Sequence, residues 1–137
     1  MENPDTALDR LVPGWLTVPD VAERLGTDPG KVRRLLQEGR LVAVRRGEPP
    51  VASIPEGFLV PGHLANPAAP SRDPDVGEWA VLAALQGTLT VLADAGFSDA
   101  EAVVWLHTPD DSLPGTPLEA LRSGRKTEVR RRAQAEL

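Results

Sequence analysis

Hydrophobic residues between positions 17 and 39 recur at helical spacing in two segments separated by a short polar stretch. The residues of the first segment that would share one helix face are Val18, Val21, Ala22 and Leu25. In the second segment they are Val32, Leu35 and Leu36. Spacing of three and four residues places side chains on one side of a helix. The pattern therefore predicts two short amphipathic helices that bury their apolar stripes against each other.

Capping residues set the expected bounds of both helices. Thr17 is suited to cap the first helix, and Asp20, three residues later, completes a pattern like a capping box. Asp28 is suited to cap the second helix, and Gly39 to end it. The connection over residues 26–28 is about as short as a helix-turn-helix requires.

A strand pattern follows directly. Residues 41–47 (LVAVRRG) begin with an apolar run that contains two β-branched valines and have period-two character, and a Glu-Pro-Pro turn comes next. Residues 51–60 can supply the return strand, with an irregularity at Pro55 because proline cannot donate to a ladder. A two-stranded hairpin after the second helix is typical of a wing, with Arg45 and Arg46 near its tip.

The pattern changes after the expected wing. Residues 63–75 hold three prolines and no periodic apolar spacing, which indicates a linker. Helices are expected over 76–96 (one long helix, or two short ones interrupted near Gly87), 98–108, 116–124 and 127–137. Ser98 with Glu101 forms a capping box for the second of these, and Thr116 can cap the third.

The chain is therefore expected to be mainly α: a winged helix-turn-helix with a two-stranded β wing, followed by a C-terminal helical bundle. We expect four segments. They are a flexible N-terminal arm over 1–11, a winged helix-turn-helix DNA-binding domain over 12–62, a linker over 63–76 and a C-terminal helical domain over 77–137.

Composition narrows the classes of function. The net charge of the 137 residues is −5, so nucleic-acid binding has to come from local basic surface. The absence of cysteine excludes disulfides, thiolate zinc sites and cysteine nucleophiles. The acidic N-terminal segment lacks the apolar region of a secretory signal, and the apolar run at 79–85 is too short to cross a bilayer. We expect a cytoplasmic, nucleoid-associated protein without a membrane partner.

Positive charge is concentrated in two regions of this acidic chain. Residues 17–46 hold seven basic and four acidic side chains, and residues 116–137 hold six basic and three acidic ones. A basic second helix followed by a basic wing is the pattern of a recognition helix with a phosphate contact beside it. The candidate DNA-binding residues are Thr27, Lys31, Arg33, Arg34, Gln37, Arg40, Arg45 and Arg46.

Within this set, Lys31 and Arg34 are three residues apart and are expected to face the groove of the DNA together. Arg33 would then contact the flanking backbone or base edges. Arginine can read guanine in the major groove with two hydrogen bonds, but the sequence does not separate base readers from phosphate binders.

The sequence leaves two possible roles open for the C-terminal arginines and for one threonine. Arg130, Arg131 and Arg132 are a candidate secondary DNA contact, or they pair with the acidic body of the protein. Thr6 is a candidate phosphorylation site for a Ser/Thr kinase, or an ordinary residue of the arm. A phosphate there would add negative charge near a DNA-binding face.

No catalytic or cofactor chemistry is expected. The sequence has no serine in a nucleophile-elbow pattern and no glycine-rich phosphate loop. His107 lies near Asp110 and Asp111, but a histidine at a helix C-terminus, where the helix dipole favours positive charge, accounts for it without a metal.

Residues 16–47 (LTVPDVAERLGTDPGKVRRLLQEGRLVAVRRG) resemble the winged helix-turn-helix of excisionase- and MerR-like DNA-binding proteins. Over residues 12–137, the chain resembles a small actinobacterial family of DNA-binding proteins, in which such a winged helix precedes a C-terminal helical region. Residues 105–124 (WLHTPDDSLPGTPLEALRSG) are similar to the toxin-binding region of Xre-type antitoxins, except in the loop between Thr108 and Thr116.

Two functions of different kinds follow. The first is binding of double-stranded DNA by the helix over 28–38 and the basic wing, in transcriptional regulation or local chromosome organisation. Homodimerisation or cooperative assembly through the C-terminal helices is expected, because one copy offers few basic contacts. The alternative is a protein–protein adaptor or antitoxin-like module that binds its partner through the C-terminal helical domain.

Overall fold

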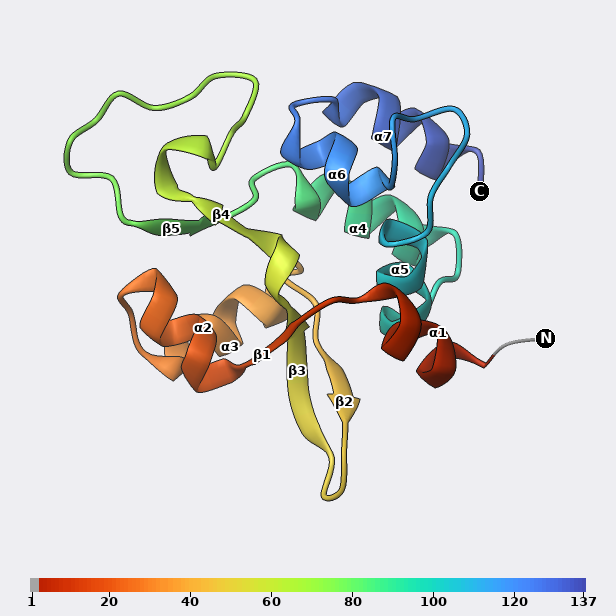
Figure 1. Ribbon diagram of the computed structural model, residues 1–137, viewed down its shortest axis with the longest axis horizontal. Helices are drawn as coiled ribbons and strands as arrows, with labels where there is room; N and C mark the ends of the chain where they lie inside the picture. The colour runs from red at the N-terminus through yellow and green to blue at the C-terminus, as the bar shows by residue number, and fades with distance from the viewer. Residues whose placement is uncertain (1–2) are drawn as a thin grey trace.

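The computed structural model describes residues 3–137 (Figure 1). The N-terminal elements are α1 (Pro4–Leu11), β1 (Trp15–Thr17), α2 (Val18–Leu25), α3 (Pro29–Gln37), β2 (Val44–Arg46) and β3 (Val51–Pro55). A 3-10 turn (Glu56–Phe58), β4 (Leu59–Pro61), a second 3-10 turn (Gly62–Leu64) and β5 (Trp79–Val81) follow. The remaining helices are α4 (Leu85–Asp94), α5 (Asp99–Leu106), α6 (Pro117–Arg122) and α7 (Lys126–Gln134).

The helix-turn-helix forms as its capping residues predict. The Thr17 hydroxyl accepts the Asp20 N–H and the Asp20 carboxylate accepts the Thr17 N–H, which completes the capping box of α2. Gly26 ends α2 in the left-handed conformation (φ 68°), which glycine adopts at little cost. The Asp28 carboxylate accepts the Lys31 N–H at 2.9 Å and caps α3. These local bonds fix the tight turn between the two helices.

The predicted wing is the antiparallel hairpin of β2 and β3, which projects away from α2 and α3 (Figure 1). On its other edge β3 pairs with β1, so that the sheet has three strands in the order β1-β3-β2. The sequence pattern missed β1 because three residues directly before a helix are too few to show alternation.

The chain from β4 to β5 differs from the prediction. We expected helix over 76–96, but Trp79–Val81 pairs with β4, and α4 begins only at Leu85. All three side chains of this strand are half-buried, without the alternation of buried and exposed positions that one face of a helix would give. Gly87 does not interrupt α4. It leaves space for the Arg130 guanidinium of α7, which a Cβ at position 87 would meet.

The predicted flexible arm is also wrong where the structure describes it. Residues 4–11 form α1, capped by Asn3, whose side chain accepts the Thr6 N–H at 2.8 Å. The apolar side chains of Ala7 and Leu8 are buried, and α1 packs against α5. The sequence did not reveal this helix because it is only two turns long, and its stability comes from packing rather than from its own pattern.

One hydrophobic core runs through both halves of the chain. Ile54 and Phe58 from the winged-helix half are fully buried in the same cluster as Leu106 and Leu121 from the C-terminal helices. Arg122 of α6 adds polar bonds across the same junction. It donates to the carbonyls of Gly57 (2.6 Å) and Leu59 (2.9 Å). The segment 63–76, which we expected to link two domains, therefore does not divide the hydrophobic core into two.

Residues 65–78 contain no helix or strand, and most are exposed. The three C-terminal helices form close to the expected positions. The Ser98–Glu101 capping box of α5 and the Thr116 cap of α6 are both present. Between residues 3 and 137, no helix has the length and apolar character needed to cross a lipid bilayer.

Candidate nucleic-acid interface

The exposed side of α3 is polar and basic. Val32 and Leu35 of α3 are buried against α2, whereas Lys31, Arg33 and Arg34 are exposed. At 3.6 residues per turn, Lys31, Arg34 and Gln37 succeed one another along the exposed side, with Arg33 beside them. The structure therefore brings these residues together on a single helix surface.

The basic side chains of this surface are available to a ligand. Among residues 3–137, the structure gives no ion pair to Lys31, Arg33, Arg34 or Arg40. Thr27, just before α3, and Arg40, just after it, are exposed at the two ends of the helix. An unpaired cationic surface on a helix can neutralise phosphates without first breaking internal ion pairs.

The two wing arginines have different surroundings, because successive residues of a strand point to opposite faces. Arg45 is exposed on β2 opposite Ala52. Arg46 forms an ion pair with Asp9 of α1, and its guanidinium lies over the Trp15 ring, 4.4 Å from the centroid. Arg46 is thus directed toward α1 and β1, and only Arg45 presents a free cation on the wing.

The partners of Arg46 were not apparent from the sequence. Asp9 lies in the segment expected to be a mobile arm, and Trp15 precedes the helix-turn-helix. No periodic pattern connects either residue with β2, so only the folded chain brings them together.

The three consecutive C-terminal arginines lie on α7, at the end of the molecule away from the wing, and each has different surroundings (Figure 1). Arg132 pairs with Asp110 (Nε to Oδ2, 3.3 Å). For this arginine, the structure therefore agrees with the alternative that it pairs with the acidic body of the protein. The Arg130 guanidinium covers Gly87 of α4. Arg131 is exposed and forms no ion pair within the described chain.

Thr6 is exposed in the first turn of α1. Its backbone N–H is held by the Asn3 cap, and Asp9, three residues further on, pairs with Arg46. The residue is accessible, but it belongs to a packed helix that contacts the wing at Arg46, the last residue of β2. Phosphorylation of Thr6 stays a prediction.

His107, directly after α5, was expected to be favoured in its charged form by the helix C-terminus, but it is buried, and burial disfavours the charged form. Its side chain is 7% exposed, and its Nδ1–H donates to the Val103 carbonyl at 2.7 Å. Burial lowers the pKa of His107 below its ordinary value of 6.5, although the bond to Val103 opposes that shift. Hydrogen bonds from Ser112, and less strongly the charge of Arg132, lower the pKa of Asp110. In the described chain no three histidine or carboxylate side chains are grouped to hold a metal ion.

The lowered pKa of His107 predicts a loss of stability at mildly acidic pH. Because the unfolded chain takes up the proton at the higher pKa, the stability that neutral His107 contributes is present above pH 6.5 and is lost as pH falls through that value. The free energy of unfolding should fall by up to about 1.4 kcal/mol per pH unit, the slope for one proton. Urea unfolding from about pH 7.5 to 5.5 measures it.

The second histidine of the chain provides the control for that measurement. His63 is exposed, so His63→Gln should keep the wild-type slope. His107→Gln should flatten it. An equal slope in wild type and His107→Gln would contradict the role of burial.

Two family models match the chain. The model described as "DNA-binding protein Rv2175c, wHTH domain" matches residues 4–59, and the model of the Rv2175c C-terminal domain of unknown function matches residues 82–136. The DNA-binding protein Rv2175c of Mycobacterium tuberculosis (strain ATCC 25618 / H37Rv) is 37% identical over 143 residues, which cover 96% of this chain and 85% of that protein. The NMR structure of Rv2175c aligns with a TM-score of 0.68 at 36% identity, and covers 89% of this chain and 80% of that one.

Proposed function

The chain belongs to the family of the DNA-binding protein Rv2175c, and we propose that it binds duplex DNA through α3 and the wing as a transcriptional regulator. The observation that carries this proposal is the unpaired basic surface of α3, which is held outward by the buried contacts of Val32 and Leu35 with α2. A helix of this kind in a winged helix-turn-helix enters the major groove.

Each part of the interface has its own task in this proposal. Lys31 and Arg34 face the groove, and Arg33 and Gln37 contact its edge or the backbone. Thr27 and Arg40 bind phosphates at either end of α3. Arg45 reaches the backbone beside the groove, whereas Arg46 holds α1 against the wing through Asp9 and Trp15.

Arg45→Ala and Arg46→Ala are expected to separate binding from stability. Arg45→Ala should weaken DNA binding by about twofold to tenfold and make the salt dependence shallower by about one phosphate contact, with the fold unchanged. Arg46→Ala should mainly lower the free energy of unfolding, by about 1 kcal/mol, because it removes a partly exposed ion pair and a cation–π contact. Fluorescence anisotropy with duplex DNA and urea unfolding measure the two effects.

Both variants lose one positive charge, so each serves as the matched control for the other. A larger loss of DNA affinity in Arg46→Ala than in Arg45→Ala would contradict the assignment of Arg45 as the phosphate contact.

A single copy offers few basic contacts, so we further propose that two or more copies bind DNA together through the C-terminal helices. Arg130 and Arg131 of α7 are the cations best placed for a secondary DNA contact, because both are exposed and neither forms an ion pair within the described chain, whereas Arg132 is held by Asp110. The DNA partner implies action on the chromosome in the cytoplasm. A Ser/Thr kinase acting at Thr6 would place a phosphate on the helix that holds Arg46.

The adaptor or antitoxin-like alternative would act through the α5–α6 region, which the family model of the Rv2175c C-terminal domain of unknown function covers. The family match does not favour it. It is tested by purification from the native host. A stoichiometric protein partner bound to the C-terminal helices would support it, and DNA bound to the purified protein would support the main proposal.

A further inference from the structure

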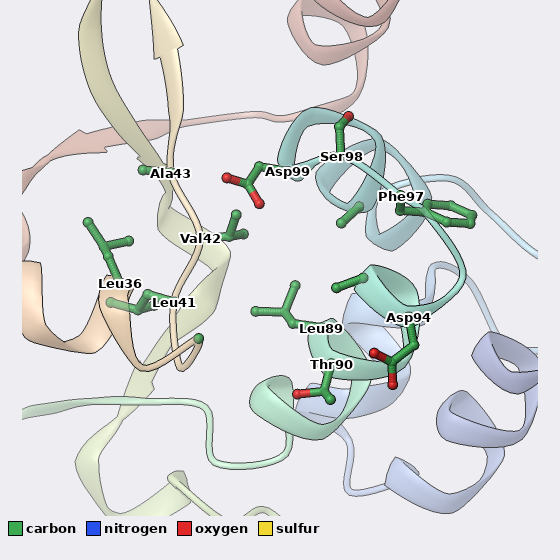
Figure 2. Close-up of a pocket in the computed structure, with 13 residues that line it drawn as sticks. Leu36, Leu41, Val42, Ala43, Leu89, Thr90, Asp94, Phe97, Ser98 and Asp99 are labelled. Carbon is green, nitrogen blue, oxygen red and sulfur yellow. The ribbon is translucent and has the colours of Figure 1, made fainter. Parts of the chain in front are cut away.

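A cavity of about 380 Å³ opens beside the end of the candidate recognition helix (Figure 2). One wall comes from the end of α3 and the segment that leads into β2, through Leu36, Leu41 and Val42. The facing wall comes from α4 and α5, through Leu89 and Ala102. Pockets that hold small molecules in proteins measure about 300–1,000 Å³, so the space is of the size that a small ligand requires.

The lining combines apolar surface with charge of one sign. Its charged side chains are Asp94, at the end of α4, and Asp99, at the start of α5. Figure 2 shows the Asp99 carboxylate at the edge between Val42 and Ser98, and the Asp94 carboxylate beside Thr90. Both residues are exposed, and within residues 3–137 neither carboxylate has a hydrogen bond or an ion pair.

We propose that this cavity binds a small amphipathic amine, with its apolar body between α3 and α4 and its ammonium group at the Asp99 carboxylate, while the Asp94 carboxylate beside Thr90 adds negative charge to the opening. The apolar walls favour burial of a hydrocarbon body. The two unpaired carboxylates favour a cation at the edge and disfavour an anion of the same shape. Charge therefore selects among ligands that fit the cavity equally well.

The position of the cavity gives this ligand a route to the DNA-reading elements. Its first wall includes the last turn of α3 and continues through Ala43 directly into β2 of the wing. Next to the lining residue Gly39, the Glu38 carbonyl at the end of α3 accepts a hydrogen bond from the Gln86 amide of α4, at 3.3 Å. A ligand that contacts both walls would favour one position of α3 relative to α4. This regulatory part rests on the proposed DNA binding, whereas the ligand site does not.

The test uses the whole chain and 2-phenylethylamine as the probe, with 2-phenylethanol and phenylacetate as neutral and anionic counterparts. Backbone amide chemical shifts are followed by NMR without DNA. The amine should cause saturable shifts at residues that line the cavity. It should bind about threefold to tenfold more tightly than the alcohol, and the anion should bind more weakly than both.

Two variants test the site itself. Asp94→Asn/Asp99→Asn should reduce amine binding to the level of the alcohol, while Asp75→Asn/Asp111→Asn, which removes two exposed carboxylates elsewhere, should leave it unchanged. Ala93→Phe should abolish binding of amine and alcohol alike, because Ala93 lines the cavity from an exposed position of α4 where a larger side chain fills the opening.

The proposal is overturned if the amine causes no saturable shift up to about 10 mM, if amine and phenylacetate bind equally, or if Ala93→Phe leaves binding intact. The regulatory part is measured separately, as DNA affinity with and without saturating amine. A change of about threefold or more supports it, and an unchanged affinity contradicts it. Absence of DNA binding in both conditions would contradict the proposed function instead, and the ligand result would still stand by itself.

Discussion

Replacing Lys31 and Arg34 together by alanine is expected to weaken binding of duplex DNA by about 30-fold to 1,000-fold, equivalent to roughly 2–4 kcal/mol. Both side chains are exposed on the same side of α3, and within the described chain neither forms an ion pair. Their removal is therefore expected to delete contacts with DNA without breaking an ion pair within the protein. The slope of log affinity against log salt should become shallower by about one to two phosphate contacts.

Fluorescence anisotropy over a salt series measures both changes. The matched control is Arg72→Ala/Lys126→Ala, which also removes one arginine and one lysine that are exposed outside α3 and the wing and form no ion pair within the described chain. Because net charge alone affects nonspecific association, the control should lose affinity by less than about threefold. Equal losses in the two double variants would show that net charge, rather than the surface of α3, governs binding.

Replacing Phe58 by alanine is expected to lower the free energy of unfolding by about 3–5 kcal/mol. Phe58 is fully buried where the winged-helix half meets the C-terminal helices, and its ring centroid lies 6.0 Å from that of His107, the residue directly after α5. The substitution leaves a cavity in a core that both halves share. Urea unfolding should show a single transition shifted to lower denaturant.

The control is Val76→Ala, in the segment between β4 and β5, where the side chain is 39% exposed and the loss should be below about 0.5 kcal/mol. If Phe58→Ala does not fold, Phe58→Leu should still fold, with a smaller loss of about 1–2 kcal/mol. Two separate transitions, with only one of them shifted, would contradict the shared core.

The sequence predicted the elements that are fixed by local bonds. The caps at Thr17, Asp28, Ser98 and Thr116 are all present, and each marks the start of a helix. A cap is a contact between residues three apart, so it can be read directly from the chain. The same holds for the wing hairpin, whose strands are adjacent in sequence.

Elements that depend on distant contacts were missed. β5 forms because Trp79–Val81 pairs with Leu59–Pro61 across a long connection, and no local signal in the apolar run at 79–85 separates this strand from a helix. α1 forms because Leu8 is buried and α1 packs against α5. Segments of such length take their structure from tertiary packing.

The candidate site likewise has features that the sequence predicts and features that only the folded chain reveals. The exposed side of α3 follows from helical periodicity, and the sequence therefore identified Lys31 and Arg34 as neighbours. The difference between Arg45 and Arg46 depends on Asp9 and Trp15, which reach Arg46 only in the folded protein. The acidic edge of the cavity beside α3 likewise arises where α4 and α5 meet the end of that helix.

The most direct test of DNA binding by α3 and the wing is an NMR titration of the whole chain with duplex DNA at low salt, which follows every backbone amide. The proposal predicts that the largest shift changes fall in residues 27–40 and 44–51, with small changes along α7. Largest changes in α5, α6 or α7, or no change at any amide, would contradict it.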